Sequence, residues 1–180
     1  MIKFIVFCTK ILVAAVVAVL FSSCKYQMGI EGNGNVTKEK RIISDKFTKV
    51  EVSHGIELIV EQGENIMVEV ETDQNIQKQL ITKVENGTLI VKFEGSINNT
   101  SAETVRIRMP KIEGISADSG AEVTSKNTLL GNTTIKLEAD SGSNIDVVLE
   151  YDAIELHADS GAEIKAEGKT LKLNTHADSG

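Results

Sequence analysis

The sequence predicts an all-β protein, built as a β-helix or β-solenoid-like stack of coils of 19–22 residues. From residue 47 onward, apolar and polar residues alternate with a period of two in several segments, as in half-buried strands. The tetrapeptide Ala-Asp-Ser-Gly also occurs four times, with spacings of 22, 19 and 19 residues. One apolar face per repeat cannot close a core alone, so repeats of this length are expected to stack on one another.

The first 23 residues have the pattern of an export signal. Lys3 and Lys10 give a short positive region, and eleven apolar residues, Ile11 to Phe21, follow it. This core is shorter than the roughly 18–20 apolar residues that span a bilayer. Small residues then precede Cys24, which resembles the bacterial lipobox, although Phe21 stands where Leu is commonest. We expect residues 1–23 to be a lipoprotein signal peptide and Cys24 to carry the lipid. The alternative is a secretory signal with an incidental cysteine.

Composition excludes several function classes. Without residues 1–23 the formal charge is −9, from 26 acidic and 17 basic residues, and no basic cluster suits nucleic acid. Once Cys24 carries lipid the body has no thiol, which excludes disulfides and thiolate chemistry. With no Trp and 4% aromatic residues, a conventional carbohydrate cleft has little support.

The remaining chain divides into a tether and one domain. Residues 24–40 are polar and contain Gly-Asn-Gly-Asn at 32–35, which favours a flexible lipid-anchored tether. Residues 41–180 form the expected domain, with strands at 47–53, 56–60, 66–70 and 104–109. Asn86-Gly87 between apolar runs predicts a hairpin. Pro110 marks the start of the clear repeats at 110–180, because proline cannot donate to a sheet ladder.

Each repeat keeps its register around the tetrapeptide. The alanines and the bulky residues two positions before them share one parity, so they are expected to face inward, around a narrow middle. Each aspartate has the opposite parity and faces outward. The residues that define the structural repeat are Ala117, Gly120, Ala139, Gly142, Ala158, Gly161, Ala177 and Gly180.

The outward aspartates are Asp118, Asp140, Asp159 and Asp178. Stacked about 4.8 Å apart, they would repel one another unless solvent or a cation intervened, and Ca²⁺ prefers such oxygens. Asp-Ser-Gly is also common turn chemistry, in which Asp caps a bend and Gly permits it. The six to eight oxygen ligands of a Ca²⁺ site are not visible, so the sequence predicts turns, with no metal and no cofactor.

Other polar residues have simple structural interpretations. His157 and His176 share one register and could together bind a metal, but Ser116 and Glu138 occupy the equivalent places, which favours a variable surface position. His54 precedes Gly55 at an expected bend without an identifiable acid–base partner. Three serines have the inward parity and are expected to hydrogen-bond the neighbouring coil as small fillers: Ser119, Ser141 and Ser160. No catalytic residue is predicted.

Three features together resemble a known family: the strand at 49–58, the segment Val84–Leu89 and the serial Ser-Gly-Ala units. This family is the "putative auto-transporter adhesin, head GIN domain" family of Bacteroidetes-type exported proteins. The resemblance covers about residue 40 to the end. It implies a β-helix-like all-β fold and an adhesin role, and it brings no catalytic residues. This sequence stops in the middle of a repeat, whereas family members continue further. The resemblance therefore implies a C-terminally truncated domain.

These observations predict a non-enzymatic lipoprotein of the bacterial cell envelope, an adhesin or scaffold anchored to a membrane, which we expect to be the outer membrane. Its partner would be a glycan or an envelope protein; the face of the membrane and the oligomeric state stay open. One alternative is a polysaccharide-cleaving β-helix enzyme, which would need Arg or Lys in phase with the carboxylates. Another is a lipid- or glycan-binding envelope protein.

Overall fold

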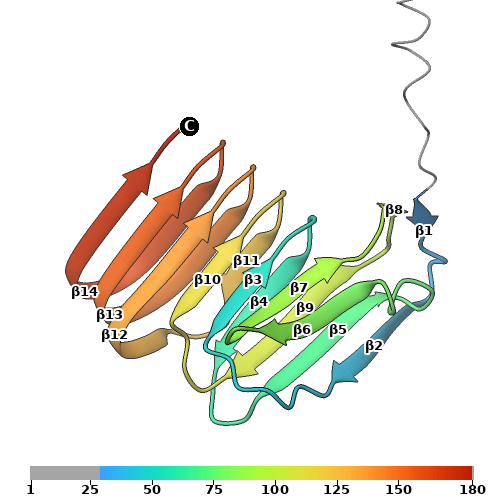
Figure 1. The fold of residues 1–180 in the computed structure, drawn as a ribbon, viewed down its shortest axis with the longest axis horizontal. Helices are drawn as coiled ribbons and strands as arrows, with labels where there is room; N and C mark the ends of the chain where they lie inside the picture. Colours follow the sequence, from blue (N-terminus) through green and yellow to red (C-terminus); the bar gives the residue numbers. More distant parts are fainter. Residues whose placement is uncertain (1–28, 180) are drawn as a thin grey trace, which may run out of the picture.

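The computed structural model describes residues 29–179 and consists of strands, turns and loops (Figure 1). The leader, Cys24 and Gly180 lie outside the described residues. Within the described part there is no helix, and hence none long and apolar enough to cross a membrane. The strands are β1 (Ile30–Glu31), β2 (Val36–Arg41), β3 (Lys49–Val52), β4 (Glu57–Gln62), β5 (Met67–Asp73), β6 (Leu80–Glu85), β7 (Thr88–Phe93), β8 (Ile97–Asn99), β9 (Glu103–Met109), β10 (Gly114–Ala117), β11 (Glu122–Ser125), β12 (Leu129–Ala139), β13 (Asn144–Ala158) and β14 (Glu163–Ala177). The prediction of an all-β fold is confirmed.

Twelve strands form one continuous sheet, while β1 and β8 form a separate parallel pair. Eleven strands follow the order β2-β5-β9-β4-β11-β13-β12-β10-β3-β7-β6, and β14 pairs with β13. The sheet curls until its two ends approach each other. At that point Arg41, the last residue of β2, donates to the carbonyl oxygen and Oε1 of Gln77, just before β6, at 2.6 and 2.9 Å. The result is a nearly closed, barrel-like sheet.

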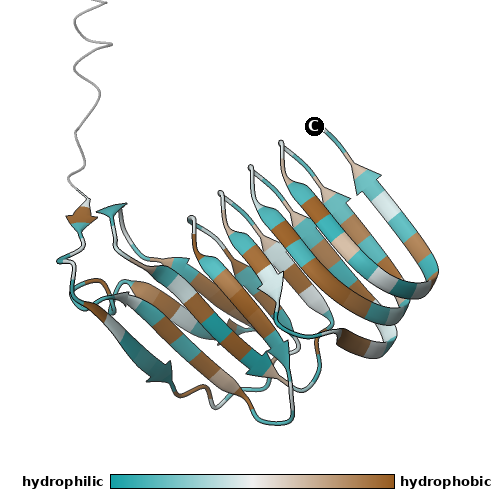
Figure 2. Cartoon of the chain, turned by 180° about the vertical axis from the view of Figure 1, so that it is seen from behind, coloured by the Kyte–Doolittle hydropathy of each residue, from teal (hydrophilic) through white to brown (hydrophobic). Residues whose placement is uncertain are grey.

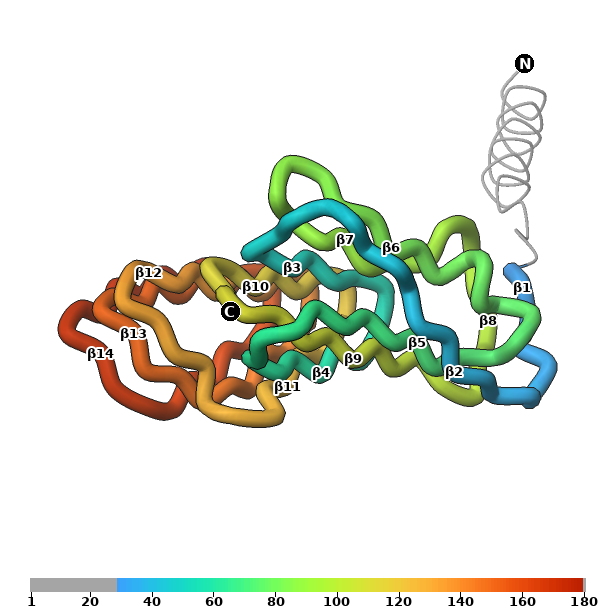
Figure 3. Tube along the Cα trace, turned by 90° about the horizontal axis from the view of Figure 1, so that it is seen from below, coloured from blue at the N-terminus to red at the C-terminus, as the bar shows by residue number. Residues whose placement is uncertain are grey.

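The Ala-Asp-Ser-Gly repeats lie side by side in parallel register. Ala117 pairs with Ala139, Ala139 with Ala158 and Ala158 with Ala177. The long strand β13 takes part in two layers, because residues 144–146 pair with β11 whereas residues 149–158 pair mainly with β12. Figure 3 shows these two layers facing each other across the interior.

The interior is filled by the residues of one strand parity. Ile115, Val123, Leu137 and Ile145 are at most 1% exposed, and Figure 2 shows apolar and polar residues alternating along the repeat strands. Next to each tight turn the interior narrows, and small side chains occupy it: Ala117, Ala121, Ala139 and Ser143. The inward parity inferred from the sequence therefore agrees with the observed burial in these repeats. Only small residues fit where the two layers converge.

The N-terminal half is held mainly by antiparallel pairing. The predicted hairpin at Asn86-Gly87 is confirmed, because β6 and β7 pair antiparallel up to Glu85 and Thr88. Asn86 and Gly87 have φ of 51° and 78°, as the tight hairpin turn requires. Strands β4 and β5 are not partners of each other; β9 lies between them, parallel to β4 and antiparallel to β5.

The predicted tether is wrong for residues 36–40. These residues belong to β2, which pairs with β5 from Val36↔Asp73 to Arg41↔Val68. Their polarity reflects a strand whose side chains are exposed or half-exposed throughout, so it was no evidence of disorder. The folded body therefore begins well before residue 41, with β1 at Ile30.

Candidate functional site

A row of similar tight turns runs along one side of the repeats. In the three Asp-Ser-Gly turns that the structure describes in full, the Ser-Gly pair has positive φ: 52° and 74° at Ser119-Gly120, 53° and 72° at Ser141-Gly142, and 51° and 75° at Ser160-Gly161. In these three turns the residue after the glycine donates its N–H to the Asp carbonyl, as from Ala121 to Asp118 at 3.2 Å. Two consecutive left-handed residues closed by this bond make a type I′ turn. We call the set the turn row: Ser53–Ile56, Asp118–Ala121, Asp140–Ser143, Asp159–Ala162 and Asp178–Ser179.

The first member of the turn row has no Asp-Ser-Gly sequence. His54 and Gly55 have φ of 66° and 73°, and β10 pairs with β3 so that Ala117 matches Val52. The Gly55 N–H donates to the Ser119 carbonyl at 3.1 Å. A bend was expected here, but it was not connected to the repeats. The available signal was a glycine three residues after the end of β3 at Val52, the same offset as from Ala117 to Gly120.

Backbone hydrogen bonds continue across the turn row from one repeat to the next. The Gly120 N–H donates to Ser141 O, and the Gly142 N–H donates to Ser160 O, at 3.1 and 3.2 Å. Asp140 N and Asp159 N each donate to the alanine carbonyl of the preceding repeat. The turns therefore use their own backbone groups to form an ordered ladder, as strands do.

The four aspartates each hold the turn in which they lie. The Ser119, Ser141 and Ser160 N–H groups donate to the preceding Asp Oδ1 at 2.6 Å, and Ser179 does so at 2.8 Å. Hydrogen bonding, chiefly from Ser141, keeps the pKa of the Asp118 carboxyl below its ordinary value. These contacts support the interpretation of the aspartates as turn acceptors. Among residues 29–179, no three His, Cys, Asp or Glu side chains are grouped to hold a metal ion.

The prediction that three serines are inward fillers is wrong. Ser119, Ser141 and Ser160 are exposed at the turn tips. The period-two argument fails there because two left-handed residues break the alternation. Ser143, at an alanine position, does behave as an inward polar residue: its hydroxyl donates to Ala117 O at 2.8 Å and accepts from Asp140 N at 3.0 Å.

The structure places the other repeat residues as follows. Ala117 and Ala139 are 1% and 2% exposed, whereas Ala158 is half-buried and Ala177, on the outermost strand β14, is exposed. Gly161 has a φ of 75°, like the glycines of the preceding turns, and Gly180 lies outside the described residues. A left-handed φ explains why glycine occupies this place in the described repeats.

The outer face of β3, β10 and β12 forms an open groove beside the turn row. One part encloses about 550 Å³ around Gly114. Lys49 on β3 and Lys136 on β12 are the strand-pairing partners of Gly114, one on either side. The adjoining part encloses about 430 Å³. We call both parts together the strand-face groove; its second part is lined by Glu51, Ser116, Ala117, Asp118, Glu138, Ala139, Asp140, His157, Ala158, Asp159 and His176.

The strand-face groove changes its charge along its length. Two lysines and three glutamates line its Gly114 part, whereas its second part contains five carboxylates and two imidazoles without a lysine or arginine. His157 and His176 are register neighbours on β13 and β14, with ring centroids 5.7 Å apart and planes tilted by 50°. The structure thus brings three of the four predicted outward aspartates, all but Asp178, and the histidine pair into one groove, which suits hydrogen bonding and cation contacts with an extended ligand.

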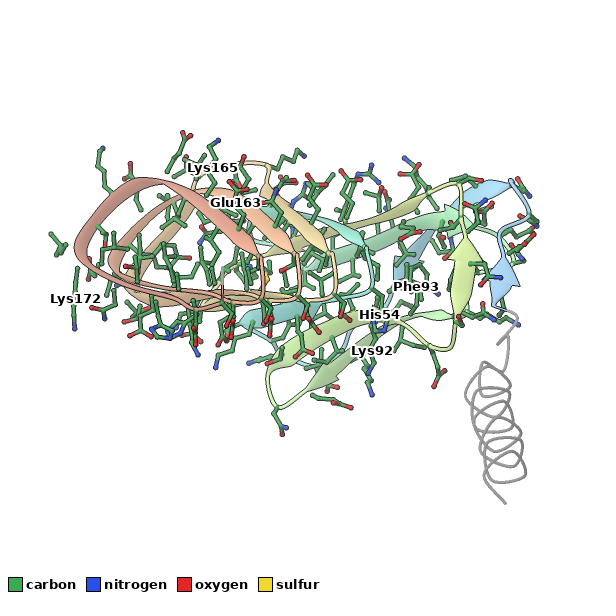
Figure 4. The ribbon with its side chains drawn as sticks, turned by 90° about the horizontal axis from the view of Figure 1, so that it is seen from above. His54, Lys92, Phe93, Glu163, Lys165 and Lys172 are labelled. Atoms are coloured by element: carbon green, nitrogen blue, oxygen red, sulfur yellow. The ribbon has the colours of Figure 1, made fainter. Side chains whose placement is uncertain are left out.

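A smaller pocket of about 370 Å³ lies at the first member of the turn row. It is lined by His54, Phe93, Gly95, Ser96, Ile97 and Glu103, and Figure 4 shows His54, Lys92 and Phe93 in this region. Ser53 Oγ lies 2.7 Å from His54 Nδ1 and orients the imidazole. Ser53 is itself buried, so its hydroxyl is not open to a substrate.

Glu103 is the residue of this pocket that sequence analysis missed. Burial raises the pKa of its carboxyl. Nothing in the sequence links it to His54, which lies 49 residues earlier, because the fold alone brings them together.

Comparison with known proteins agrees with the architecture. The family model described as "Putative auto-transporter adhesin, head GIN domain" matches residues 46–180. The chain belongs to this family. No functionally curated protein matches the chain.

Several solved structures share this architecture. A putative adhesin from Bacteroides fragilis superposes with a TM-score of 0.77 at 17% identity, over 84% of this chain and 71% of that one. A putative adhesin from Parabacteroides merdae gives 0.62 at 19%, over 83% and 80%. A structure from Parabacteroides distasonis described as a putative lipid binding protein gives 0.62 at 14%, over 84% and 76%. At these identities the likeness concerns the fold.

Proposed function

We propose that this GIN-domain protein is a non-enzymatic, lipid-anchored binding module of the bacterial cell envelope that acts as an adhesin. In this proposal the repeat region is a short β-solenoid whose outer strand face contacts a glycan or an envelope protein. Family membership supports the adhesin role, since the family is described as adhesins of the GIN type.

The β-solenoid interpretation rests on pairing. Residues one repeat apart are parallel neighbours in both layers, as for Ile145↔Ile164 in one and Leu137↔Leu156 in the other. The turn row continues the ladder around the corner between the layers. Each repeat thus contributes one turn and parts of both layers, which is the organisation of a solenoid coil.

The observation that carries the binding function is the strand-face groove beside the rigid turn row. Ordered backbone presents Glu51, Ser116, Glu138 and His157 in one register at the strand spacing of about 4.8 Å. An extended polymer with repeating hydroxyl or amine groups can contact such a regular row. The turn aspartates at the groove edge are held by the following Ser N–H groups, so the edge is preorganised for binding.

The polysaccharide-cleaving alternative needs basic groups beside the carboxylates. All three arginines lie away from the strand-face groove, and its basic groups are Lys49 and Lys136 in the Gly114 part, where Lys136 is already paired with Glu138 at 2.6 Å. Arg106 pairs with Glu71 and Arg108 with Glu61 at 3.0 Å, while Arg41 pairs with Glu39 at 2.8 Å. A guanidinium already paired on another surface does not stabilise charge in the groove, which disfavours cleavage chemistry there.

A lipid-binding role is suggested by the Parabacteroides distasonis structure described in those words. An internal lipid would have to occupy the space between the layers. Close-packed side chains such as Leu58, Ile145 and Leu149, each 0% exposed, fill that space. We therefore favour binding at the outer surface.

Membrane attachment is proposed through Cys24, with the protein at the outer membrane on its periplasmic or outer surface. Replacing Cys24 with Ala should yield a protein that partitions into the aqueous phase. After cell fractionation this protein should be found in the soluble fraction and not with the membranes. A Cys24→Ala protein that stays with membranes in high salt would contradict the anchor.

The binding role is tested with the Cys24→Ala protein, screened against envelope glycans and envelope proteins. We expect saturable binding that weakens in Glu138→Gln. The matched control is Glu163→Gln, an exposed carboxylate on the opposite layer (Figure 4). Release of shortened products from polyuronides would instead support the enzyme.

A further inference from the structure

The segment 29–35 is fixed to the body, although its sequence predicts a flexible linker. Ile30 N donates to Ser96 O at 2.8 Å, and Gly32 N donates to Asn99 O at 2.7 Å. Asn75 makes two more bonds to the segment: its Oδ1 accepts from Asn33 N at 3.0 Å, and its Nδ2 donates to Glu31 O at 2.7 Å. We call residues 29–35 the strap.

A buried carboxylate secures the site where the strap crosses the body. Asp73 is 0% exposed and accepts from Ser101 N at 2.6 Å and from Thr100 Oγ1 at 2.9 Å. Gly32 passes so close that an added Cβ would collide with the Asp73 carboxylate. The strap is therefore a packed part of the body, and the free length of chain before it is correspondingly short.

The number of residues between the proposed lipid site and the strap sets a maximum distance. Four residues, 25–28, separate Cys24 from Gly29. Even a fully extended chain covers at most about 3.3–3.6 Å per residue, so Gly29 lies within about 18 Å of the lipid-bearing cysteine. A long swing of the body around a flexible tether is excluded at this length.

The strap lies at one end of the molecule and the last repeat at the other. Figures 1 and 3 both place β1 and β8 at the end opposite β14. Between β7, which directly precedes β8, and β14 there are five strand spacings in the order β7-β3-β10-β12-β13-β14. At about 4.8 Å each, β14 lies about 24 Å beyond β7.

The distribution of acids also bears on which surface faces the bilayer. The long sides carry rows of exposed acids: Asp140, Asp159 and Asp178 along the turn row, and Glu122 and Glu163 on the opposite layer. The strap end has one exposed acid on the strap, Glu31, among the neutral amides of Asn33, Asn35, Asn75, Asn98 and Asn99 around β1 and β8. Anionic lipid headgroups repel carboxylates, which disfavours the long sides against the bilayer.

From these observations we propose that the β1–β8 end rests on the bilayer surface and that the repeats stand away from it, with β14 outermost. This inference rests on the proposed lipid anchor at Cys24. It places the strand-face groove away from the membrane, where a glycan or protein on another surface can reach it.

The test uses the full, lipidated protein in phosphatidylethanolamine–phosphatidylglycerol vesicles that contain a nitroxide headgroup quencher. With Cys24 acylated and Cys8 removed with the leader, an introduced cysteine is the only free thiol. Fluorophores are attached in three variants at exposed positions: Ser96→Cys at the strap end, Ser141→Cys in the turn row and Lys172→Cys on β14 (Figure 4). We expect the Ser96 label to lose most of its fluorescence and the other two to keep theirs.

Each outcome is informative. A Lys172 label or a Ser141 label quenched as strongly as the Ser96 label would overturn the orientation, and so would the absence of quenching at Ser96 in vesicle-bound protein. Vesicle flotation is measured in parallel, and protein that fails to float contradicts the anchor itself.

A spacer variant tests the cause of the orientation. A twenty-residue Gly/Ser insertion before Gly29, with ends about 25 Å apart on average, should relieve quenching at Ser96 without affecting flotation. Quenching that persists with the spacer would show that tether length does not hold the end at the membrane.

Discussion

Replacing Ala139 with leucine tests the converging interior at the turn row. Ala139 is 2% exposed, lies one residue before a type I′ turn, and has Ala117 and Ala158 as its register neighbours on either side. Three extra carbon atoms have no space where the two layers meet. Overpacking of a well-packed core costs about 1–3 kcal/mol. For a domain of this size each kcal/mol lowers Tm by about 3 °C, so we expect a decrease of about 3–9 °C.

The matched control is Asp140→Asn, at the next residue. Asp140 is exposed, and its Oδ1 accepts from Ser141 N at 2.6 Å, a bond that an asparagine oxygen can also accept. We expect its Tm to change by less than about 2 °C, as for most surface substitutions. Thermal unfolding followed by circular dichroism measures both. Equal destabilisation by the two substitutions would refute the assignment of the inward and outward faces.

Three further predictions address the turns, the strap and the aspartates. Gly142→Ala should destabilise the protein by about 1 kcal/mol in denaturant unfolding, because φ is 72° there, whereas Ser141→Asn should be neutral or stabilising. The hydrogen bond from Ser101 N–H is the main reason that the pKa of Asp73 is lowered in the folded protein. The ionised carboxylate therefore stabilises the fold at pH values above its pKa in the unfolded chain, and this stabilisation is lost as pH falls through its pKa in the folded protein. Asp73→Asn should therefore flatten the acid limb of stability against pH; an unchanged limb would argue against it. If the aspartates bind no metal, a chelator should leave Tm unchanged. Ca²⁺ bound at a concentration 100 times its Kd would instead add about 2.7 kcal/mol to the free energy of unfolding. A Ca²⁺-dependent rise in Tm that disappears in Asp140→Asn would establish a metal site.

The inward face of the repeats could be read from sequence because strand alternation is a local property. Ile115, Leu137 and Val123 follow the period of two directly, and the side chains are buried as that period requires. The same reasoning failed at Ser119 and Ser141, because alternation assumes extended backbone and these residues are left-handed. The Ser-Gly dipeptide was the signal for the turn, but its effect on parity depends on the turn type.

Long-range contacts could not be predicted from the sequence. Polar residues at 36–40 pair with β5, and the strap is held by Asn75 and Asp73 from a segment about forty residues later. A run of Gly and Asn has the same composition whether it is free or docked, so composition favoured a tether. His54 and Glu103 likewise come together through the parallel pairing of β4 and β9.

The central claim is that the strand-face groove binds a ligand and leaves it chemically unchanged. The direct measurement is a titration of the Cys24→Ala protein with a ligand from the envelope screen, with mass analysis of the ligand before and after. We predict saturable binding, an intact ligand, weaker affinity in Glu138→Gln and unchanged affinity in Glu163→Gln. A shortened ligand, or equal affinity in both variants, would contradict the account.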